Sequence, residues 1–310
     1  MIDKENITIL IVDDEPEIRG LIADYLEDDE GYKVLVAEDG IDALKNVLPD
    51  NHVDLVLSDI NMPRMKGFEL LHEVKNRYPA IKRVLITAYN VEDYFELAMK
   101  HDVGNIFVKT TPFNFSELST VLENLLTDDI FGADRYMQGD FKRFMFVVTR
   151  GDGLQKDADA IIDCLPPYIE KKKLELVLVE LLTNAIFYGI RGEIPSKKET
   201  WDHDFELSND DAIQIQVLWD DKKYAISIND RGGRLKKQDV LYWLHRQIGK
   251  DERGLPHGIM DSHGRGLFIA RKYIDRLLIN IATNSRTEII IINYYNEEYS
   301  GFKPLYINEI

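Results

Sequence analysis

Five polar side chains follow short apolar segments in the first part of the chain, and their types suit phosphoryl chemistry. The segments are "ITILIV", "VDLVLS", "RVLI" and "NIFV", and the side chains after them are Asp13, Asp14, Asp59, Thr87 and Lys109. If the segments are parallel strands of one sheet, their carboxyl ends meet at one edge and these side chains converge. Three carboxylates in one place repel each other unless a cation neutralises them, and an oxygen-rich site suits Mg²⁺.

A carboxylate beside such a cation can attack a phosphoryl group and become an aspartyl-phosphate. Lys109 and Thr87 would then neutralise and hydrogen-bond the new phosphoryl oxygens. The alternative interpretation is that these are solubilising turn residues. That explanation suffices for any one of them, but five polar residues at matching strand ends favour a site.

A second candidate site begins in the stretch "VELLTNAIFYG", which has the pattern of a buried helix. Glu180 and Asn184 are four residues apart, so they share one helical face. Burying a carboxylate and a carboxamide costs several kcal/mol unless something pairs with them. The oxygen of Asn184 can coordinate Mg²⁺, and Glu180 can deprotonate or orient an attacking hydroxyl or water.

Further residues of this second set lie in "SINDRGGRL", "DSHGRGLFIARKYID" and "TEIIIINY". Asp230 at a strand end can accept a hydrogen bond from an adenine amino group. Glycines before a helix expose the free N–H groups to which phosphates bind. The candidate nucleotide-binding residues, in addition to Asn184, are Asp230, Gly232, Gly233, Gly264, Arg265, Gly266, Leu267 and Thr287. A glycine-rich turn alone is more often only a turn, and the chain contains no P-loop motif.

The order of the expected elements indicates two domains. Residues 1–126 alternate five apolar strands with amphipathic helices, which predicts an α/β doubly wound fold with a five-stranded parallel sheet. Residues 127–139 are a polar, glycine-containing linker. Residues 140–296 read as an α+β sandwich with helices on one face of a mixed sheet, and residues 297–310 as a solvated C-terminal tail.

Composition and charge exclude several classes of protein. The net charge is −17, and residues 1–128 hold 12 basic and 26 acidic side chains. Such a chain does not suit a phosphate backbone, so we expect no direct binding of nucleic acid. No apolar run is long enough to cross a bilayer, no signal peptide is evident, and one cysteine, Cys164, permits no intrachain disulfide. These features predict a cytoplasmic protein that does not contact membranes.

Residues 1–126 closely resemble the receiver domain of bacterial response regulators, a flavodoxin-like fold. The resemblance rests on "ILIVDDEP", "LSDINMPRMKG", "LITAY" and "IFVKTTP". It implies that Asp59 is the phosphoacceptor, that Thr87 is a switch residue, and that a cognate sensor histidine kinase is the partner. The implied Mg²⁺ ligands are Asp13, Asp14, Asp59 and the Asn61 carbonyl. The chain departs from the family pattern at Ile106, where an aromatic residue is usual, and Phe107 follows it.

Residues 140–296 resemble the ATP-binding domain of the GHKL (HATPase, Bergerat-fold) superfamily, and within it the anti-sigma-factor serine kinases. The resemblance rests on the Glu-x-x-x-Asn-Ala helix and the glycine-rich segments, and it implies that Glu180 and Asn184 face Mg-ATP. Tyr188 stands where the family motif has histidine, and Arg234 where a further glycine is common.

The leading hypothesis is a response regulator in which phosphorylation of Asp59 controls a serine/threonine protein kinase of the anti-sigma-factor type. Its partner would be an anti-anti-sigma (STAS-type) or sigma-factor-like protein, and it could form a homodimer. One alternative is a docking module that binds nucleotide without transferring phosphate. Another is a degenerate interaction domain that binds no nucleotide. A self-phosphorylating histidine kinase is disfavoured, because no histidine occurs between His101 and His203.

Overall fold

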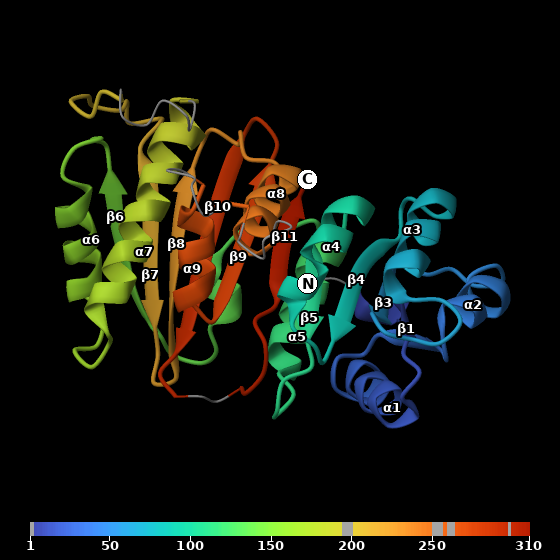
Figure 1. Cartoon of the computed structure of the whole chain (residues 1–310). Coiled ribbons are helices and arrows are strands. Elements are labelled where there is room, and N and C mark those ends of the chain that lie inside the picture. Colours follow the sequence, from blue (N-terminus) through green and yellow to red (C-terminus); the bar gives the residue numbers. More distant parts are fainter. Residues whose placement is uncertain (1–2, 194–200, 250–256, 259–263, 297–298) are drawn as a thin grey trace. The chain divides into compact units, whose positions relative to one another are not determined.

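The computed structural model describes residues 3–193, 201–249, 257–258, 264–296 and 299–310. The chain divides into two compact units (Figure 1). Unit 1 comprises Met1–Ile130 with Tyr299–Tyr306, and unit 2 comprises Phe131–Glu298 with Ile307–Ile310. The expected linker, 127–139, is therefore divided between the units after Ile130.

Unit 1 is built on five parallel strands in the order β2-β1-β3-β4-β5. Their bounds are β1 Thr8–Val12, β2 Lys33–Ala37, β3 Leu55–Asp59, β4 Lys82–Thr87 and β5 Asn105–Val108. β3 and β5 are buried along their whole length, which explains their unbroken apolar sequence. The expected doubly wound sheet of the first domain is confirmed.

Helices alternate with these strands along the chain. They are α1 Pro16–Asp24, α2 Gly40–Asp42, α3 Gly67–Arg77, α4 Phe95–His101 and α5 Phe115–Thr127. A short 3-10 turn, η4 Val91–Tyr94, precedes α4. Asn114 is the N-cap of α5, and its side chain accepts a hydrogen bond from the Glu117 amide at 3.1 Å.

The segment Tyr299–Tyr306 adds to unit 1 beside β5. Strand β11, Leu305–Glu309, begins here, and Leu305 and Tyr306 pair antiparallel with Ile106 and Asn105. The hydroxyl of Tyr306, which is 1% exposed, donates to the Glu117 carboxylate at 2.7 Å. The expectation of a solvated tail is therefore wrong for this strand, because its apolar residues are buried.

Unit 2 contains the strand order β9-β10-β8-β7-β6, with antiparallel neighbours throughout. The bounds are β6 Lys142–Val148, β7 Ile213–Trp219, β8 Lys223–Asp230, β9 Arg276–Ala282 and β10 Arg286–Tyr294. Ile310 donates to Ile281 O and accepts from Thr283 N, at 2.9 and 3.2 Å, which is the pattern of a parallel neighbour. The sheet is thus mixed, as the sequence predicts.

Four helices of unit 2 lie in front of this sheet in Figure 1. They are α6 Leu154–Asp163, α7 Lys171–Thr183, α8 Lys237–Ile248 and α9 Gly266–Tyr273, and α7 packs against both α6 and α9. The helix expected from "VELLTNAIFYG" changes character at Asn184, because residues Asn184–Ile190 form a π-helical segment, η6.

A buried polar cluster surrounds Glu288 on β10. Because adjacent residues of a strand point to opposite faces, this cluster lies on the face of β8 and β10 opposite to Thr287. Glu288 is 1% exposed and accepts hydrogen bonds from Ser227 Oγ at 2.6 Å and from the Gly132 amide at 2.9 Å. Asn280 also donates to it, at 3.2 Å. Gly132, expected in a polar linker, is thereby fixed to the sheet of unit 2.

Candidate functional site

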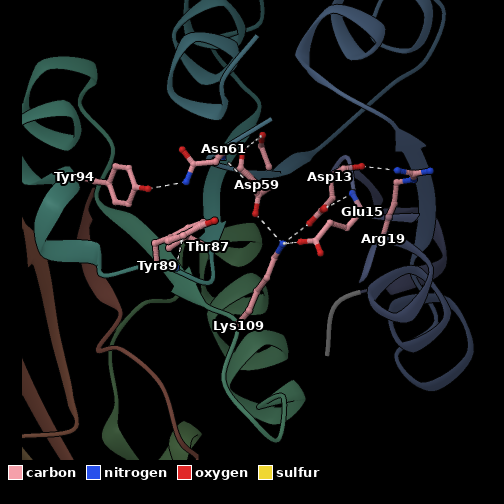
Figure 2. A network of polar contacts seen from close by, with 10 residues as sticks. Asp13, Glu15, Arg19, Asp59, Asn61, Thr87, Tyr89, Tyr94 and Lys109 are labelled. Atoms are coloured by element: carbon pink, nitrogen blue, oxygen red, sulfur yellow. Dashed lines mark hydrogen bonds and ion pairs between the residues drawn. The ribbon is translucent and has the colours of Figure 1, made fainter. Parts of the chain in front are cut away.

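The carboxyl ends of β1, β3, β4 and β5 bring Asp13, Asp59, Thr87 and Lys109 together at one edge of the sheet of unit 1 (Figure 2). The ammonium of Lys109 lies 2.8 Å from Asp13 Oδ2 and 2.8 Å from Asp59 Oδ1. Asp13 is fully buried, and Asp59 is 7% exposed. One lysine is thus ion-paired with two carboxylates that have little access to water, and it balances one of their two negative charges.

This geometry shifts the pKa values of the lysine and of one aspartate. Burial opposes the charge on Lys109, but Asp59 and Asp13 outweigh it and raise the pKa of the ammonium, so the lysine stays charged. Burial raises the pKa of the Asp59 carboxyl, although Lys109 and the Asn61 amide act in the opposite direction. A buried carboxylate with a fixed cation beside it has few hydrogen bonds to water, which favours its use as a nucleophile.

Main-chain groups hold the two carboxylates in place. The Asn61 amide donates to Asp59 Oδ2 at 2.6 Å, and the Glu15 amide donates to Asp13 Oδ1 at 2.9 Å. Gly67, at the start of α3, passes so close to β3 that a Cβ there would lie 2.2 Å from the Asp59 carbonyl oxygen. The glycine in "PRMKG" is therefore required by close approach of the backbone.

Thr87 is fully buried at the end of β4, and its hydroxyl accepts a hydrogen bond from the Tyr89 amide at 3.1 Å. The Asn61 side chain donates to the Tyr94 hydroxyl at 2.7 Å (Figure 2). Tyr89 and Tyr94 were missed in the sequence because no periodicity marks aromatic residues in a loop or a single short turn. Ile106 and Phe107 are both buried in β5.

The expected cluster of three carboxylates is not formed in this arrangement. Asp14 is exposed, and the described residues contain no group of three or more His, Cys, Asp and Glu side chains that could hold a metal ion. The chemistry of the remaining donors, two carboxylates and the Asn61 carbonyl, still suits a hard cation.

Unit 2 contains a pocket of about 330 Å³ between η6, β8, β10, α8 and the start of α9. Six of the residues chosen from the sequence line it, namely Asn184, Asp230, Gly264, Gly266, Leu267 and Thr287. Its apolar wall includes Ala185, Ile228 and Ile289. Side chains from four separate segments of the chain thus meet in one cavity.

Asp230 is the most perturbed acid of this pocket. It is 5% exposed, and burial raises its pKa to about 6, although the amides of Gly232 and Gly233 act against the shift. Those amides donate to Asp230 Oδ1 at 2.9 and 3.4 Å. The two glycines therefore hold the aspartate rather than lining the pocket.

Glu180 does not line the pocket, but its side chain faces the first residue of α9, Gly266, which does. A Cβ on Gly266 would lie 3.0 Å from both Glu180 Oε2 and Asn184 Nδ2, so these two side chains point at the start of α9. Arg265 is the N-cap residue of α9 and does not line the pocket. The polar pair on the helix 171–190 therefore faces the glycine-rich segment.

Sequence reasoning missed Trp243, whose ring forms one wall of the pocket. Gly264 has φ +76°, and a Cβ there would lie 2.3 Å from this ring. Tyr188 and Arg234, the two departures from the family motif, also line the pocket. Residues 250–256 and 259–263, between α8 and Gly264, lie outside the described residues.

Comparison with known proteins finds relatives of unit 1. The sensor histidine kinase RcsC of Escherichia coli K12 is 44% identical over 86 residues, which are 28% of this chain and 9% of that protein. The transcriptional regulatory protein MalR of Bacillus subtilis is 29% identical over 118 residues, 38% of this chain and 49% of that protein. The chain thus spans less than half the length of these curated relatives.

Solved structures cover the same region. The response regulator TrrA of Thermotoga maritima in complex with Mg(2+)-BeF is 37% identical and covers 38% of this chain and 98% of its own, with a TM-score of 0.34. In the described part of the chain, no helix is both long and apolar enough to span a membrane. The model of the response regulator receiver domain matches residues 9–123. Residues 9–123, with their acidic pair, buried Asp59 and bridging Lys109, are therefore a response regulator receiver domain.

Proposed function

We propose that the chain is a two-component response regulator whose phosphorylation at Asp59 controls an ATP-binding output domain of the GHKL type, formed by unit 2. The output would be a serine/threonine protein kinase similar to the anti-sigma-factor kinases, acting on an anti-anti-sigma (STAS-type) or sigma-factor-like protein. A sensor histidine kinase would supply the phosphoryl group.

In unit 1, a carboxylate oxygen of Asp59 attacks the phosphorus of a phosphohistidine on the sensor kinase. An O–P bond forms, the P–N bond breaks, and the imidazole leaves. Lys109 would neutralise the added charge, and the Thr87 hydroxyl would donate to a phosphoryl oxygen. Asp13, Asp59 and the Asn61 carbonyl would hold Mg²⁺, which would supply further neutralisation of the transferred group.

In unit 2, Asp230 would accept a hydrogen bond from the adenine amino group, and the apolar wall would contact the ring. The free N–H groups near Gly264 and Gly266 would bind phosphate oxygens, and Asn184 would hold Mg²⁺. Glu180 would take the proton of a serine or threonine hydroxyl whose oxygen attacks the γ-phosphorus, so that ADP leaves.

One observation carries the proposal for unit 2. Residues selected for their nucleotide chemistry, from four segments between 184 and 287, line a single pocket of about 330 Å³ that contains a buried aspartate. This volume lies within the range of small-molecule sites, which are mostly apolar with a few polar groups.

A second function is favoured by a specific observation. Glu180 does not line the pocket, whereas Tyr188 does, and burial followed by the charge of Glu180 raises the pKa of Tyr188 to about 12. Nucleotide binding without phosphate transfer, controlling a docking surface, is consistent with that arrangement.

The test is calorimetric titration of the full chain with ATP, with and without Mg²⁺, before and after treatment with beryllofluoride. We expect Mg-dependent binding that Asn184→Ala abolishes and that the exposed control Asn209→Ala retains. Absence of binding by the wild-type chain in every state would contradict the proposal for unit 2.

A second assay separates the two functions of unit 2. The full chain is incubated with γ-labelled ATP and a STAS-type protein, and label on a serine or threonine of that protein is measured. Labelling that Glu180→Gln abolishes supports the kinase. Binding of ATP without labelling supports the docking module.

A further inference from the structure

Strand β6 is the outermost strand of the sheet in the described part of unit 2. It pairs with β7 on one side, and the strand order ends there. Phe144, Met145 and Val147 are 37%, 60% and 63% exposed. A long apolar edge strand offers a row of main-chain donors and acceptors to another strand, and native proteins usually block such edges with charges or proline.

The charged residues of β6, Lys142 and Arg143, lie at its beginning. The five residues from Phe144 to Val148 are apolar. Apolar side chains lie on both faces of the strand, because successive side chains point to opposite faces. Phe144 and Phe146 share one face, and Met145 and Val147 share the other. The edge is thus suited to pairing through backbone and side chains together.

We propose that β6 pairs antiparallel with β6 of a second copy of this chain, about a two-fold axis through Met145. Such an axis is perpendicular to the joined sheet, so each residue faces a residue of the same face of the partner strand. Phe144 then faces Phe146 in two symmetric aromatic pairs, and Met145 faces Met145.

The charges at the two ends of the strand select this register. With the axis through Met145, the exposed side chain of Asp140 faces the exposed side chain of Arg150, twice in the dimer. Arg150 also pairs with Asp152 of its own chain, at 2.8 Å. Lys142 and Arg143 face Val148 and Val147. With the axis through Phe146, Lys142 would face Arg150, and like charges directly opposite each other are destabilising.

An axis through Phe144 is also inferior, because it would place Asp140 opposite Val148 and leave Arg150 facing Gln138 instead of an acidic residue. Complementary charge therefore favours a second copy in one register over an unrelated strand. This inference is independent of nucleotide binding and of phosphorylation at Asp59.

Disulfide trapping tests the register directly, on the full chain with Cys164→Ser as background. Met145→Cys places two thiols opposite each other, so mild oxidation is expected to give a covalent dimer. Val147→Cys is the matched control on the same face. Its two thiols would be separated by four residue steps, roughly 14 Å along the strands, beyond the reach of a disulfide.

Charge reversal tests the ends of the strand. Asp140→Arg and Arg150→Asp, each alone, are expected to weaken dimerisation roughly tenfold in sedimentation equilibrium, because each sets two like-charged pairs face to face. The double variant restores opposite charges and is expected to recover the wild-type association. Both positions are exposed, so folding is retained and can be checked by circular dichroism.

Two results would overturn the inference. One is a wild-type chain that stays monomeric at high micromolar concentration. This holds even if a different protein is found to bind the edge of β6. The other is Val147→Cys cross-linking as readily as Met145→Cys.

Discussion

The side-chain amide of Asn61 donates a hydrogen bond to the hydroxyl of Tyr94 at 2.7 Å. This bond joins the loop after strand β3, which ends at Asp59, to the η4 turn that precedes α4. The main-chain amide of the same asparagine bonds to Asp59. Two hydrogen bonds, both donated by Asn61, therefore connect the Asp59 carboxylate to η4.

Removing the Tyr94 hydroxyl is expected to shorten the lifetime of the phosphorylated state. In Tyr94→Phe the Asn61 amide is released and can reach a water beside the phosphoryl group. A hydrogen bond contributes about 1 kcal/mol, so an acceleration of roughly fivefold is the expected scale. The measurement is decay of the phosphorylated chain, with Tyr78→Phe as control. An unchanged rate would show that Asn61 stays in place without the bond.

Loss of Lys109 is expected to destabilise unit 1 at neutral pH. In Lys109→Met, two buried carboxylates lose their cation, and breaking a buried pair costs about 3–5 kcal/mol. Burial already raises the pKa of Asp59, and loss of Lys109 raises it further, so the loss is greatest at pH 7 and shrinks as the pH falls and this carboxyl takes up a proton.

Urea denaturation of wild type and Lys109→Met at pH 7 and near pH 5 checks this. Lys66→Met, at an exposed lysine, is the control and is expected to change the free energy of unfolding little. If the free energy of unfolding of Lys109→Met lies below that of the wild type by the same amount at both pH values, the electrostatic explanation is contradicted.

Asp230 is expected to make unit 2 less stable as the pH rises. Its folded pKa is about 6 and its ordinary value is 3.8, so the unfolded chain loses the proton first. Below the lower value both states are protonated and the aspartate imposes no penalty. Above pH 6 the full penalty applies, about 3 kcal/mol for two pKa units.

The matching variant is Asp230→Asn, which keeps the size of the side chain and removes its titration. The free energy of unfolding of the wild type, relative to this variant, should fall between pH 4 and pH 7. A difference that is flat over this interval would mean that Asp230 titrates at its ordinary value.

Substitution of two glycines by alanine is expected to change stability in opposite directions. Gly67→Ala forces a Cβ against the Asp59 carbonyl and is expected to cost roughly 1–3 kcal/mol, with slower phosphorylation of Asp59. Gly20→Ala, within α1, has no atom within 4 Å of its new Cβ and is expected to stabilise by about 0.5–1 kcal/mol. Thermal unfolding of both variants measures the difference, and equal effects would refute the close approach at Gly67.

The strand ends that carry Asp13, Asp59, Thr87 and Lys109 were predictable, because unbroken apolar runs mark buried parallel strands and the residue after each run is fixed by the register. The bridging of Asp13 and Asp59 by Lys109 was not, because the sequence gives strand ends but no side-chain rotamers.

In unit 2 the residues selected by motif meet in one pocket, but Trp243 was missed, because it comes from an ordinary amphipathic helix. The π-helical segment from Asn184 was also not predictable, since an apolar period of 3.6 does not distinguish it from a regular helix. The pairing of Leu305 with Ile106 joins residues about 200 positions apart, and local pattern carries no information on such a pairing.

The position of Tyr299–Tyr306 in unit 1 has a consequence for synthesis on the ribosome. Chains emerge from the N-terminus at roughly 5–20 residues per second, so β5 precedes its partner Leu305 by roughly 10–40 s. During that interval the outer edge of β5 is unpaired, and Glu117 lacks the Tyr306 hydroxyl. The nascent receiver is therefore exposed to edge-to-edge association until almost the whole of this sequence has been translated.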